Sequence, residues 1–126
     1  MQIGAVSTVF VKRSFRDACQ RMHDLGLKTI EIGTGGYFPK NHCDPSALLQ
    51  DKSKLEKFQE TLQEFQLTIS AFAIHGDPLH PNPTISQAYL HDFRDSCMLA
   101  ERIGVTRFTL LAGLPEAVPG DKEPNW

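Results

Sequence analysis

The feature that most constrains the fold of this chain is a regular alternation of short β-prone runs with segments of helical periodicity. Between the β-prone runs, apolar residues recur three or four positions apart, which is the pattern of a helix with one buried face. Such alternation is typical of βαβ units, in which parallel strands are joined by right-handed helical crossovers. The expected strands are residues 2–9, 27–33, 67–74 and 105–112.

Capping residues mark where the helices begin and end. Ser14 and Asp44 suit N-cap positions, and Pro45 fits the first turn of the helix that Asp44 opens. Gly26 suits the position after a helix, where a left-handed backbone favours glycine. Residues 34–43 are expected to form a loop. The expected helices are residues 14–25, a short segment at 44–49, residues 52–65, and residues 86–103 between the cap Ser86 and the terminator Gly104.

The length of the chain decides between two folds that share this pattern. The 126 residues suffice for one ordinary domain with one core. A complete (βα)8 barrel needs roughly 200 residues or more. The competing interpretation is a small flavodoxin-like domain, but no phosphate-binding signature follows the first strand. We therefore expect an α/β fold whose parallel βα repeats are the first four units, or half, of a (β/α)8 TIM barrel. Residues 1–126 are then the N-terminal part of a single domain, truncated after strand four.

Composition and charge argue against several classes of partner. The formal net charge is −2, and Lys and Arg are scattered rather than gathered into the basic patch that nucleic acid or an anionic membrane requires. The N-terminal apolar run precedes its charges, the wrong order for a secretory signal, and no run approaches the ~20 apolar residues of a membrane span. Cys19, Cys43 and Cys97 are odd in number and far apart, which does not fit a disulfide framework. We expect a cytoplasmic protein with reduced thiols, of which Cys19 and Cys97 lie on apolar helix faces.

Polar side chains that could take part in catalysis or metal binding gather directly after the third expected strand. His75, Asp77 and His80 follow the apolar run 67–74 and are separated by glycine and proline. A loop that follows a buried strand is the usual place for the active-site residues of α/β proteins. Asp77 has a second interpretation, as a turn residue that caps the backbone amides of Leu79 or His80. His80 either turns back over the site or stiffens the loop, and the irregular spacing argues against a metal site made of all three side chains.

Three further polar residues need an interpretation. Glu31 lies between Ile30 and Ile32 in the second expected strand, where an unpaired carboxylate is costly. It either contacts a substrate or holds a neighbouring Arg or Lys inside a polar barrel interior. His42 is predicted to be a solvated loop side chain, and His91 falls off the apolar face of its helix.

Several stretches together resemble the sugar phosphate isomerase/epimerase family, which has a xylose isomerase-like TIM barrel. The resemblance covers essentially the whole chain, but only about the first half of the family's barrel. HGDPLHP is its most specific part, at the end of the third expected strand. The family also includes inosose dehydratases, ketose 3-epimerases and a DNA-repair endonuclease branch. The matching stretches are TIEIGTGGY, ISAFAIHGDPLHPNP, RIGVTRFTLLAGLP and PGDKEPNW.

The resemblance implies a metal-assisted proton transfer in the intact barrel. In such enzymes a divalent metal (Mn, Mg, Co or Zn) at the barrel mouth holds two oxygens of a sugar or sugar phosphate. A carboxylate then moves a proton at the carbon beside the carbonyl. The usual ligands are Glu, Asp, His and Glu from strands five to eight, outside this chain, so no catalytic residue is assigned here and the piece alone is expected to be inactive.

The family's pattern places Glu31 and His75 at the mouth, as substrate-binding residues or as residues that support them. In the endonuclease branch a histidine after strand three is a metal ligand, which leaves that role open for His75. Asp77 stands where family members often carry Asn, and this puts the substrate contact there in doubt. His80 completes the set of candidate residues.

Other functions within the same fold remain open. A related lyase or dehydratase would use similar chemistry, and a sugar-binding barrel would have kept the fold without catalysis. Abasic-site repair would require basic residues around the mouth, where this half offers Lys40 and few others. We expect a small-molecule sugar ligand, neither nucleic acid nor membrane as a partner, and association into a homo-oligomer as an option.

Overall fold

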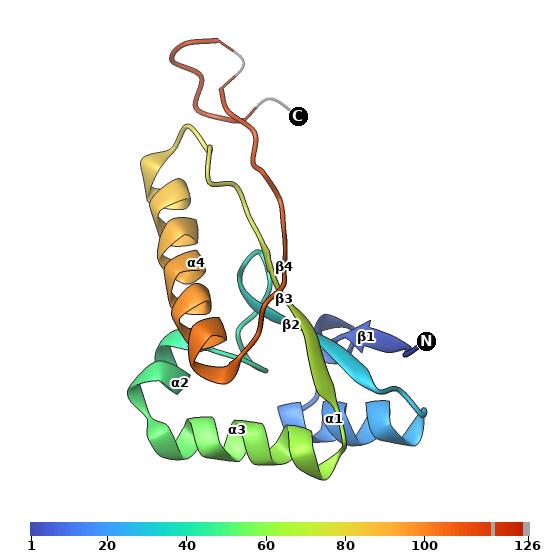
Figure 1. The fold of residues 1–126 in the computed structure, drawn as a ribbon. Helices are drawn as coiled ribbons and strands as arrows, with labels where there is room; N and C mark the ends of the chain where they lie inside the picture. The colour runs from blue at the N-terminus through green and yellow to red at the C-terminus, as the bar shows by residue number, and fades with distance from the viewer. Residues whose placement is uncertain (117, 125–126) are drawn as a thin grey trace.

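A computed structural model describes residues 1–116 and 118–124 of the chain. Four parallel strands form one sheet in the order β1-β2-β3-β4 (Figure 1). The strands are β1 (Gly4–Val6), β2 (Thr29–Gly36), β3 (Thr68–His75) and β4 (Phe108–Leu110). The helices are the 3-10 segment η1 (Ser7–Phe10), α1 (Phe15–Asp24), α2 (Pro45–Gln50), α3 (Lys52–Glu64) and α4 (Pro83–Ile103).

The strand order separates the two folds that the sequence left open. Each strand pairs with the strand that precedes it in the chain, and all the pairs are parallel. A flavodoxin-like sheet reverses its order near the first strand, whereas a TIM barrel adds strands in sequence. The expected half-barrel arrangement is therefore confirmed.

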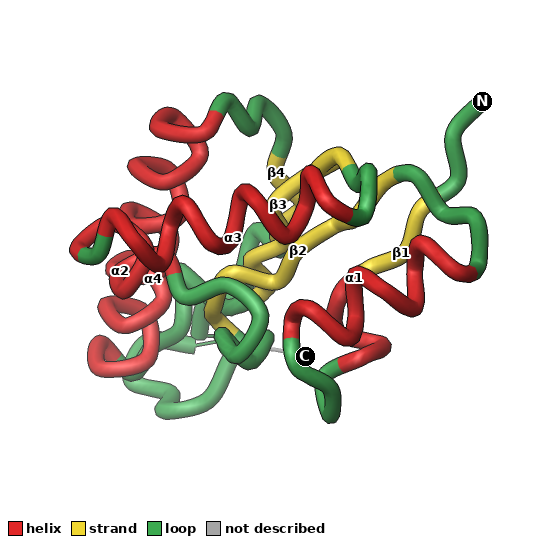
Figure 2. Tube along the Cα trace, turned by 90° about the horizontal axis from the view of Figure 1, so that it is seen from below, coloured by secondary structure: helices red, strands yellow, loops and turns green. Residues whose placement is uncertain are grey.

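The sheet has one face that packs against helices and one face that carries small and polar residues. Ile32 pairs with Phe72, and both are fully buried in the core with Met22 of α1 and Phe58 of α3. Seen from below, the helices are gathered along one side of the strands (Figure 2). The opposite face carries the alternate residues, because side chains alternate along a strand.

The first, second and fourth strands differ in length from the expected ones, and the fourth is only Phe108–Leu110 instead of residues 105–112. The first is only Gly4–Val6, because residues 7–10 turn into the 3-10 helix instead of continuing the strand. The second extends to Gly36, into residues expected to be a loop. Gly33 pairs with Ala73 and Gly35 with Ile74, so β2 holds one extra residue at this point. Gly35 and Gly36 have φ values of 144° and 67°, which side chains disfavour, and this lets the strand bulge and continue.

The helix caps agree with the sequence except at α4. Ser14 and Asp44 accept hydrogen bonds from backbone N–H groups in the first turns of α1 and α2, as expected. The cap of α4 is Asn82 rather than Ser86, so the helix starts at Pro83. The Asn82 side chain accepts from the backbone N–H of Thr84 at 3.0 Å, and Pro83 is preset for a first helical turn.

The prediction for His42 was wrong. Its side chain is buried, and Nε2 lies 2.9 Å from the carbonyl oxygen of Arg13. The ring also lies against Phe15, with centroids 6.1 Å apart. This contact joins two segments separated by 29 residues, so the local sequence gave no signal of it. By contrast, His91 is exposed on α4, as expected.

The cysteines are free thiols in the described structure. Cys19 and Cys43 are buried and Cys97 is half-buried. Burial raises the pKa of the Cys19 thiol to about 12 and raises that of Cys43 further. Among the described helices, none is both long and apolar enough to cross a membrane. Ala117, Asn125 and Trp126 lie outside the described residues, so the end of the PGDKEPNW match does too.

Candidate functional site at the carboxyl ends of the strands

The loops after β3 and β4 run side by side above the sheet, and Asp77 joins them (Figure 1). Its Oδ1 accepts hydrogen bonds from the backbone N–H groups of Leu79 at 3.0 Å and Leu114 at 2.9 Å. The first bond is the turn role expected for Asp77. The second links two loops 37 residues apart in sequence. Gly113 makes this approach feasible, since a Cβ there would lie 2.4 Å from Asp77 Oδ1.

A pocket of about 280 Å³ lies beside this junction. Asp77 is 3% exposed, and its Oδ2 is a buried side-chain oxygen for which the described residues provide no hydrogen-bond partner. Buried polar atoms are normally paired, so an unpaired carboxylate oxygen next to a pocket is an unusual feature of this loop. The pocket is lined mainly by apolar and backbone groups, from Tyr37, Gly76, Asp77, Leu111, Ala112, Gly113 and Leu114.

His75 lies at the carboxyl end of β3, where the sequence placed it. The imidazole is half-buried and packs on Phe38, with ring centroids 4.6 Å apart. The carbonyl oxygen of His75 accepts from the backbone N–H of Tyr37 at 2.6 Å. The loop after β2 is therefore fixed to the end of β3, with Phe38 against His75 and Tyr37 in the wall of the pocket.

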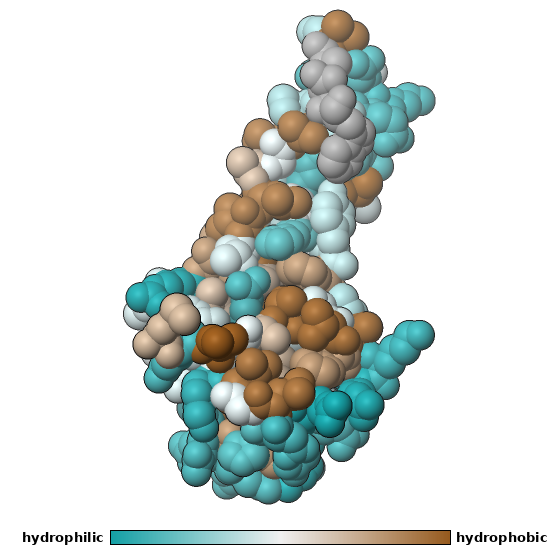
Figure 3. Space-filling view, turned by 90° about the vertical axis from the view of Figure 1, so that its right-hand side faces the viewer, coloured by the Kyte–Doolittle hydropathy of each residue, from teal (hydrophilic) through white to brown (hydrophobic). Residues whose placement is uncertain are grey.

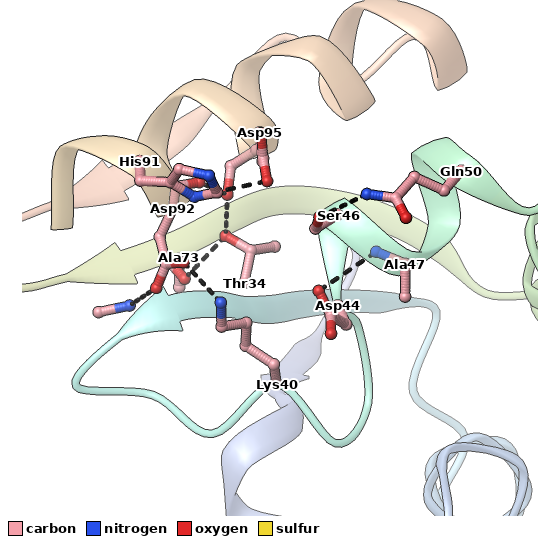
Figure 4. A network of polar contacts seen from close by, with 12 residues as sticks. Thr34, Lys40, Asp44, Ser46, Ala47, Gln50, Ala73, His91, Asp92 and Asp95 are labelled. Atoms are coloured by element: carbon pink, nitrogen blue, oxygen red, sulfur yellow. Dashed lines mark hydrogen bonds and ion pairs between the residues drawn. The ribbon is translucent and has the colours of Figure 1, made fainter. Parts of the chain in front are cut away.

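Asp92 of α4 supports that loop, a role that no sequence motif indicated. Asp92 Oδ2 accepts from the backbone N–H of Gly36 at 3.0 Å, and Oδ1 pairs with Lys40 Nζ at 2.5 Å (Figure 4). Next to it, Ser96 of α4 donates to the Thr34 hydroxyl at 2.9 Å. The Gly35–Gly36 pair is the sequence feature that could have indicated this close contact. A side chain at Gly35 would clash with Asp92, because its Cβ would lie 2.6 Å from Asp92 Oδ2.

Glu31 lies on the face of the sheet that carries polar residues. Its Oε1 accepts from the hydroxyl of Thr109 on β4 at 3.0 Å. The bond crosses β3, where Ala71 and Ala73 pair with Glu31 and Gly33 and leave room for it. The partner is thus a threonine rather than the Arg or Lys that the sequence suggested, and a carboxylate is held on the inner face below the mouth.

His80 has a structural role in the loop after β3. Its Nδ1 accepts the backbone N–H of Asn82 at 2.9 Å, next to the cap of α4. This corresponds to the loop-stiffening alternative. Among residues 1–116 and 118–124, no group of three His, Cys, Asp or Glu side chains is placed to hold a metal ion. His75, Asp77 and His80 therefore do not form a metal site by themselves.

A family model described as "Xylose isomerase-like TIM barrel" matches residues 19–125. The chain belongs to this family. The match begins within α1 and covers every later helix and strand, including every residue of the mouth described above. It agrees with the sequential order of four parallel strands.

Two similar proteins are much longer than this chain. The uncharacterized protein YfiH of Bacillus subtilis (strain 168) is 32% identical over 127 residues, which cover 100% of this chain and 40% of YfiH. The crystal structure of the probable 3-DHS dehydratase AsbF, involved in petrobactin synthesis in Bacillus anthracis, matches with a TM-score of 0.64 at 16% identity. That match covers 90% of this chain and 39% of AsbF, and it shows a shared fold. The chain thus spans about two fifths of the length of either protein.

Proposed function

We propose that this chain supplies one wall of the active site of a sugar or sugar phosphate isomerase or epimerase. In the complete barrel, the reaction moves a proton at a carbon next to a carbonyl group. Membership of the xylose isomerase-like TIM barrel family supports the enzyme class. The observation that carries the proposal is the pocket lined by Tyr37 and Asp77 at the carboxyl ends of β2, β3 and β4, with His75 as the last residue of β3. Barrel enzymes place their chemistry at that end.

The residues of this chain are assigned to the substrate rather than to a metal. His75 would contact a sugar oxygen from its position against Phe38, and Glu31 would contribute negative charge on the inner face. We propose a divalent metal (Mn, Mg, Co or Zn) for the complete barrel, where it would polarise the carbonyl. The described residues lack a three-ligand cluster, so they do not fit such an ion on their own.

A sugar-binding barrel without catalysis is the second candidate. It is favoured by one observation, the largely apolar lining of the pocket. Turnover by a protein of the full family length separates the two candidates, since only the enzyme would exchange a substrate proton with solvent.

The test is the full-length protein that carries this chain, incubated with ketoses or ketose phosphates and Mn²⁺ in D₂O. We expect deuterium to enter the carbon next to the carbonyl, as followed by proton NMR. His75→Gln should lower kcat/KM by about ten- to hundredfold, because a hydrogen bond to the reacting sugar is lost. His91→Gln, at an exposed site on α4, is the control and should leave the rate unchanged. Equal rates for both variants would show that His75 does not contact the substrate. The absence of proton exchange with solvent would favour the sugar-binding protein.

A further inference from the structure

We propose that Tyr89 of α4 is a positioning residue for the mouth, because it fixes the backbone on both sides of His75 and so sets the direction of the imidazole. The inference rests on the proposed function only in taking the imidazole as a substrate contact. It adds a residue outside the pocket lining on which that contact depends.

Tyr89 contacts the chain directly before and directly after His75. Its side chain is 6% exposed, and its hydroxyl donates to the carbonyl oxygen of Ile74 at 3.4 Å, which is a long hydrogen bond. Burial raises the pKa of Tyr89, so the hydroxyl stays protonated and remains a donor. On the other side of His75, the ring lies against the backbone of Gly76. His75, the last residue of β3, is therefore held between two contacts made by one aromatic side chain.

The contact between Tyr89 and Gly76 is close enough to require glycine. A Cβ on Gly76 would lie 2.7 Å from Tyr89 Cε2 and nearer still to Cδ2, well inside normal packing distance. The backbone conformation does not require glycine here, because Gly76 is not among the glycines with positive φ. The glycine of the HGDPLHP stretch is thus explained by the close approach of Tyr89.

The same ring reaches the end of β2. Gly36 pairs with His75, and a Cβ on Gly36 would lie 3.4 Å from Tyr89 Cδ2. The next residue, Tyr37, donates its backbone N–H to the carbonyl oxygen of His75 at 2.6 Å. Tyr89 therefore packs where the ends of β2 and β3 meet, and a shift of its ring would move both.

The direction of the imidazole matters because catalysis depends steeply on geometry. A displacement of about 1 Å can cost about a hundredfold in rate, even when its cause lies away from the reacting atoms. The imidazole of His75 is half-buried and rests on Phe38. Its backbone is the other constraint on its position, and Tyr89 holds that backbone.

Two substitutions of Tyr89 in the full-length protein separate the ring from the hydroxyl. Tyr89→Leu removes both, and we expect kcat/KM for proton exchange to fall about tenfold and the ring resonances of His75 to shift in NMR spectra. Tyr89→Phe keeps the ring contact with Gly76. It should leave the resonances near their wild-type positions and lower kcat/KM by no more than about threefold, the effect of one long hydrogen bond.

Phe58→Leu is the control for a general loss of packing. Phe58 is 5% exposed on α3 and stacks on Phe15, with ring centroids 4.7 Å apart. Its substitution removes a buried aromatic ring, as Tyr89→Leu does, but should leave kcat/KM and the His75 resonances unchanged. Equal effects of the two leucine variants on His75 would make Tyr89 a packing residue and overturn the proposal.

Gly76→Ala tests the same contact in a protein that keeps Tyr89, and so serves if Tyr89→Leu does not fold. The new methyl group should displace the ring, shift the His75 resonances and lower kcat/KM about tenfold. Unchanged resonances would overturn the proposal.

The double variant shows whether Gly76→Ala acts through Tyr89. In the Tyr89→Leu background the methyl group no longer meets the ring, so its further effect on kcat/KM should be less than about threefold. Gly76 also lines the pocket, and a methyl group that only obstructed the substrate would act equally in both backgrounds. Additive effects would therefore overturn the proposal.

The NMR shifts require no turnover, which separates this inference from the proposed function. The expected shifts without proton exchange by the wild-type protein would refute the isomerase and leave the positioning of His75 by Tyr89 intact. Proton exchange by the wild-type protein, with unshifted His75 resonances in Tyr89→Leu and Gly76→Ala, would do the reverse.

Discussion

Asp77 shows how one side chain can join two loops of a site. Its Oδ1 closes the gap between the loops after β3 and β4, and its Oδ2 is buried without a hydrogen-bond partner among the described residues. Substitution by Ala would remove both hydrogen bonds at once. The geometry depends equally on Gly113, whose missing side chain gives Asp77 room to approach the second loop.

Gly113→Ala should therefore disrupt the junction. A Cβ at this position would lie 2.4 Å from Asp77 Oδ1 and 2.7 Å from Pro78 Cδ, and the backbone has a φ of +90°. Positive φ alone costs a non-glycine residue about 1 kcal/mol, and loss of the buried hydrogen bond adds about 1–3 kcal/mol. The free energy of unfolding, measured by urea denaturation, should fall by the sum of both terms.

Gly120→Ala is the control for this prediction. Gly120 has a similar φ of +95°, but a Cβ there would meet nothing within 4 Å. It should show the backbone cost alone. A loss of stability in Gly113→Ala no larger than in Gly120→Ala would mean that the Asp77 junction does not stabilise the protein.

At the residue level, the sequence predicted the hydrogen bonds that form between residues close together in the chain. The bond from Leu79 to Asp77 spans two residues and follows from the turn preference of aspartate. The bonds from Leu114 to Asp77 and from Thr109 to Glu31 span 37 and 78 residues. They exist because the sheet brings the strand ends together, so no local pattern could reveal them.

Helix α4 acts as a support for the mouth as well as a cover for the sheet. Through Asp92 it holds the bulged end of β2, and that end carries Tyr37 and Phe38 to His75 and the pocket. The geometry of the site thus depends on an element that does not itself line the pocket.

Asp92→Ala should loosen the loop after β2. Gly36 N–H and the Lys40 ammonium would both lose their partner. We expect the free energy of unfolding to fall by about 1–3 kcal/mol and the ring resonances of His75 to shift in NMR spectra, since Phe38 would no longer be held against it.

Asp95→Ala is a closely matched control on the same helix. The side chains of Asp92 and Asp95 are 17% and 20% exposed, but among the described residues the ion pair of Asp95 is with the exposed His91, at 3.7 Å. Its substitution should leave the His75 resonances in place. Similar shifts in both variants would show that a general change in α4, rather than the contact with Gly36, affects the site.

At the level of elements, types were easier to predict than boundaries. Periodicity located the four strands and the four α-helices but not the 3-10 helix η1, because apolar spacing records which face is buried. The extension of β2 through Gly36 was missed since two glycines usually indicate a loop, and here tertiary contacts with Asp92 and His75 stabilise a bulged strand. The start of α4 was predicted at the wrong residue because Asn82 and Ser86 are both good N-cap residues. In the structure Pro83 occupies the first turn of the helix, so Asn82 is the cap.

The whole described structure is an open sheet rather than a closed barrel. Within the described residues, β1 and β4 each pair with a single neighbouring strand, so each has one edge without a strand partner. Apolar side chains also gather over the middle of one face of the molecule (Figure 3). Leu110 of β4 is 47% exposed. Unpaired edges and exposed apolar surface both promote association.

The chain of 126 residues should therefore self-associate in isolation. Light scattering coupled to size exclusion should give a mass that rises with protein concentration. Leu110→Lys should reduce this association, because a charge on an edge strand opposes strand pairing. Leu25→Lys, at a residue that is 56% exposed at the end of α1, should have little effect. A constant monomeric mass with cooperative unfolding would contradict the prediction.

The sequential order of the strands also has a consequence for how the chain folds during synthesis. Ala5 pairs with Ile30, Ile32 with Phe72, and Phe72 with Phe108, so every strand finds its partner in the segment made just before it. The crossover between two such partners spans one helical unit, so its closure costs less entropy than pairing with a strand farther along the chain. The sheet can therefore grow strand by strand as the polypeptide leaves the ribosome, with each completed βα unit presenting the template on which the next one aligns.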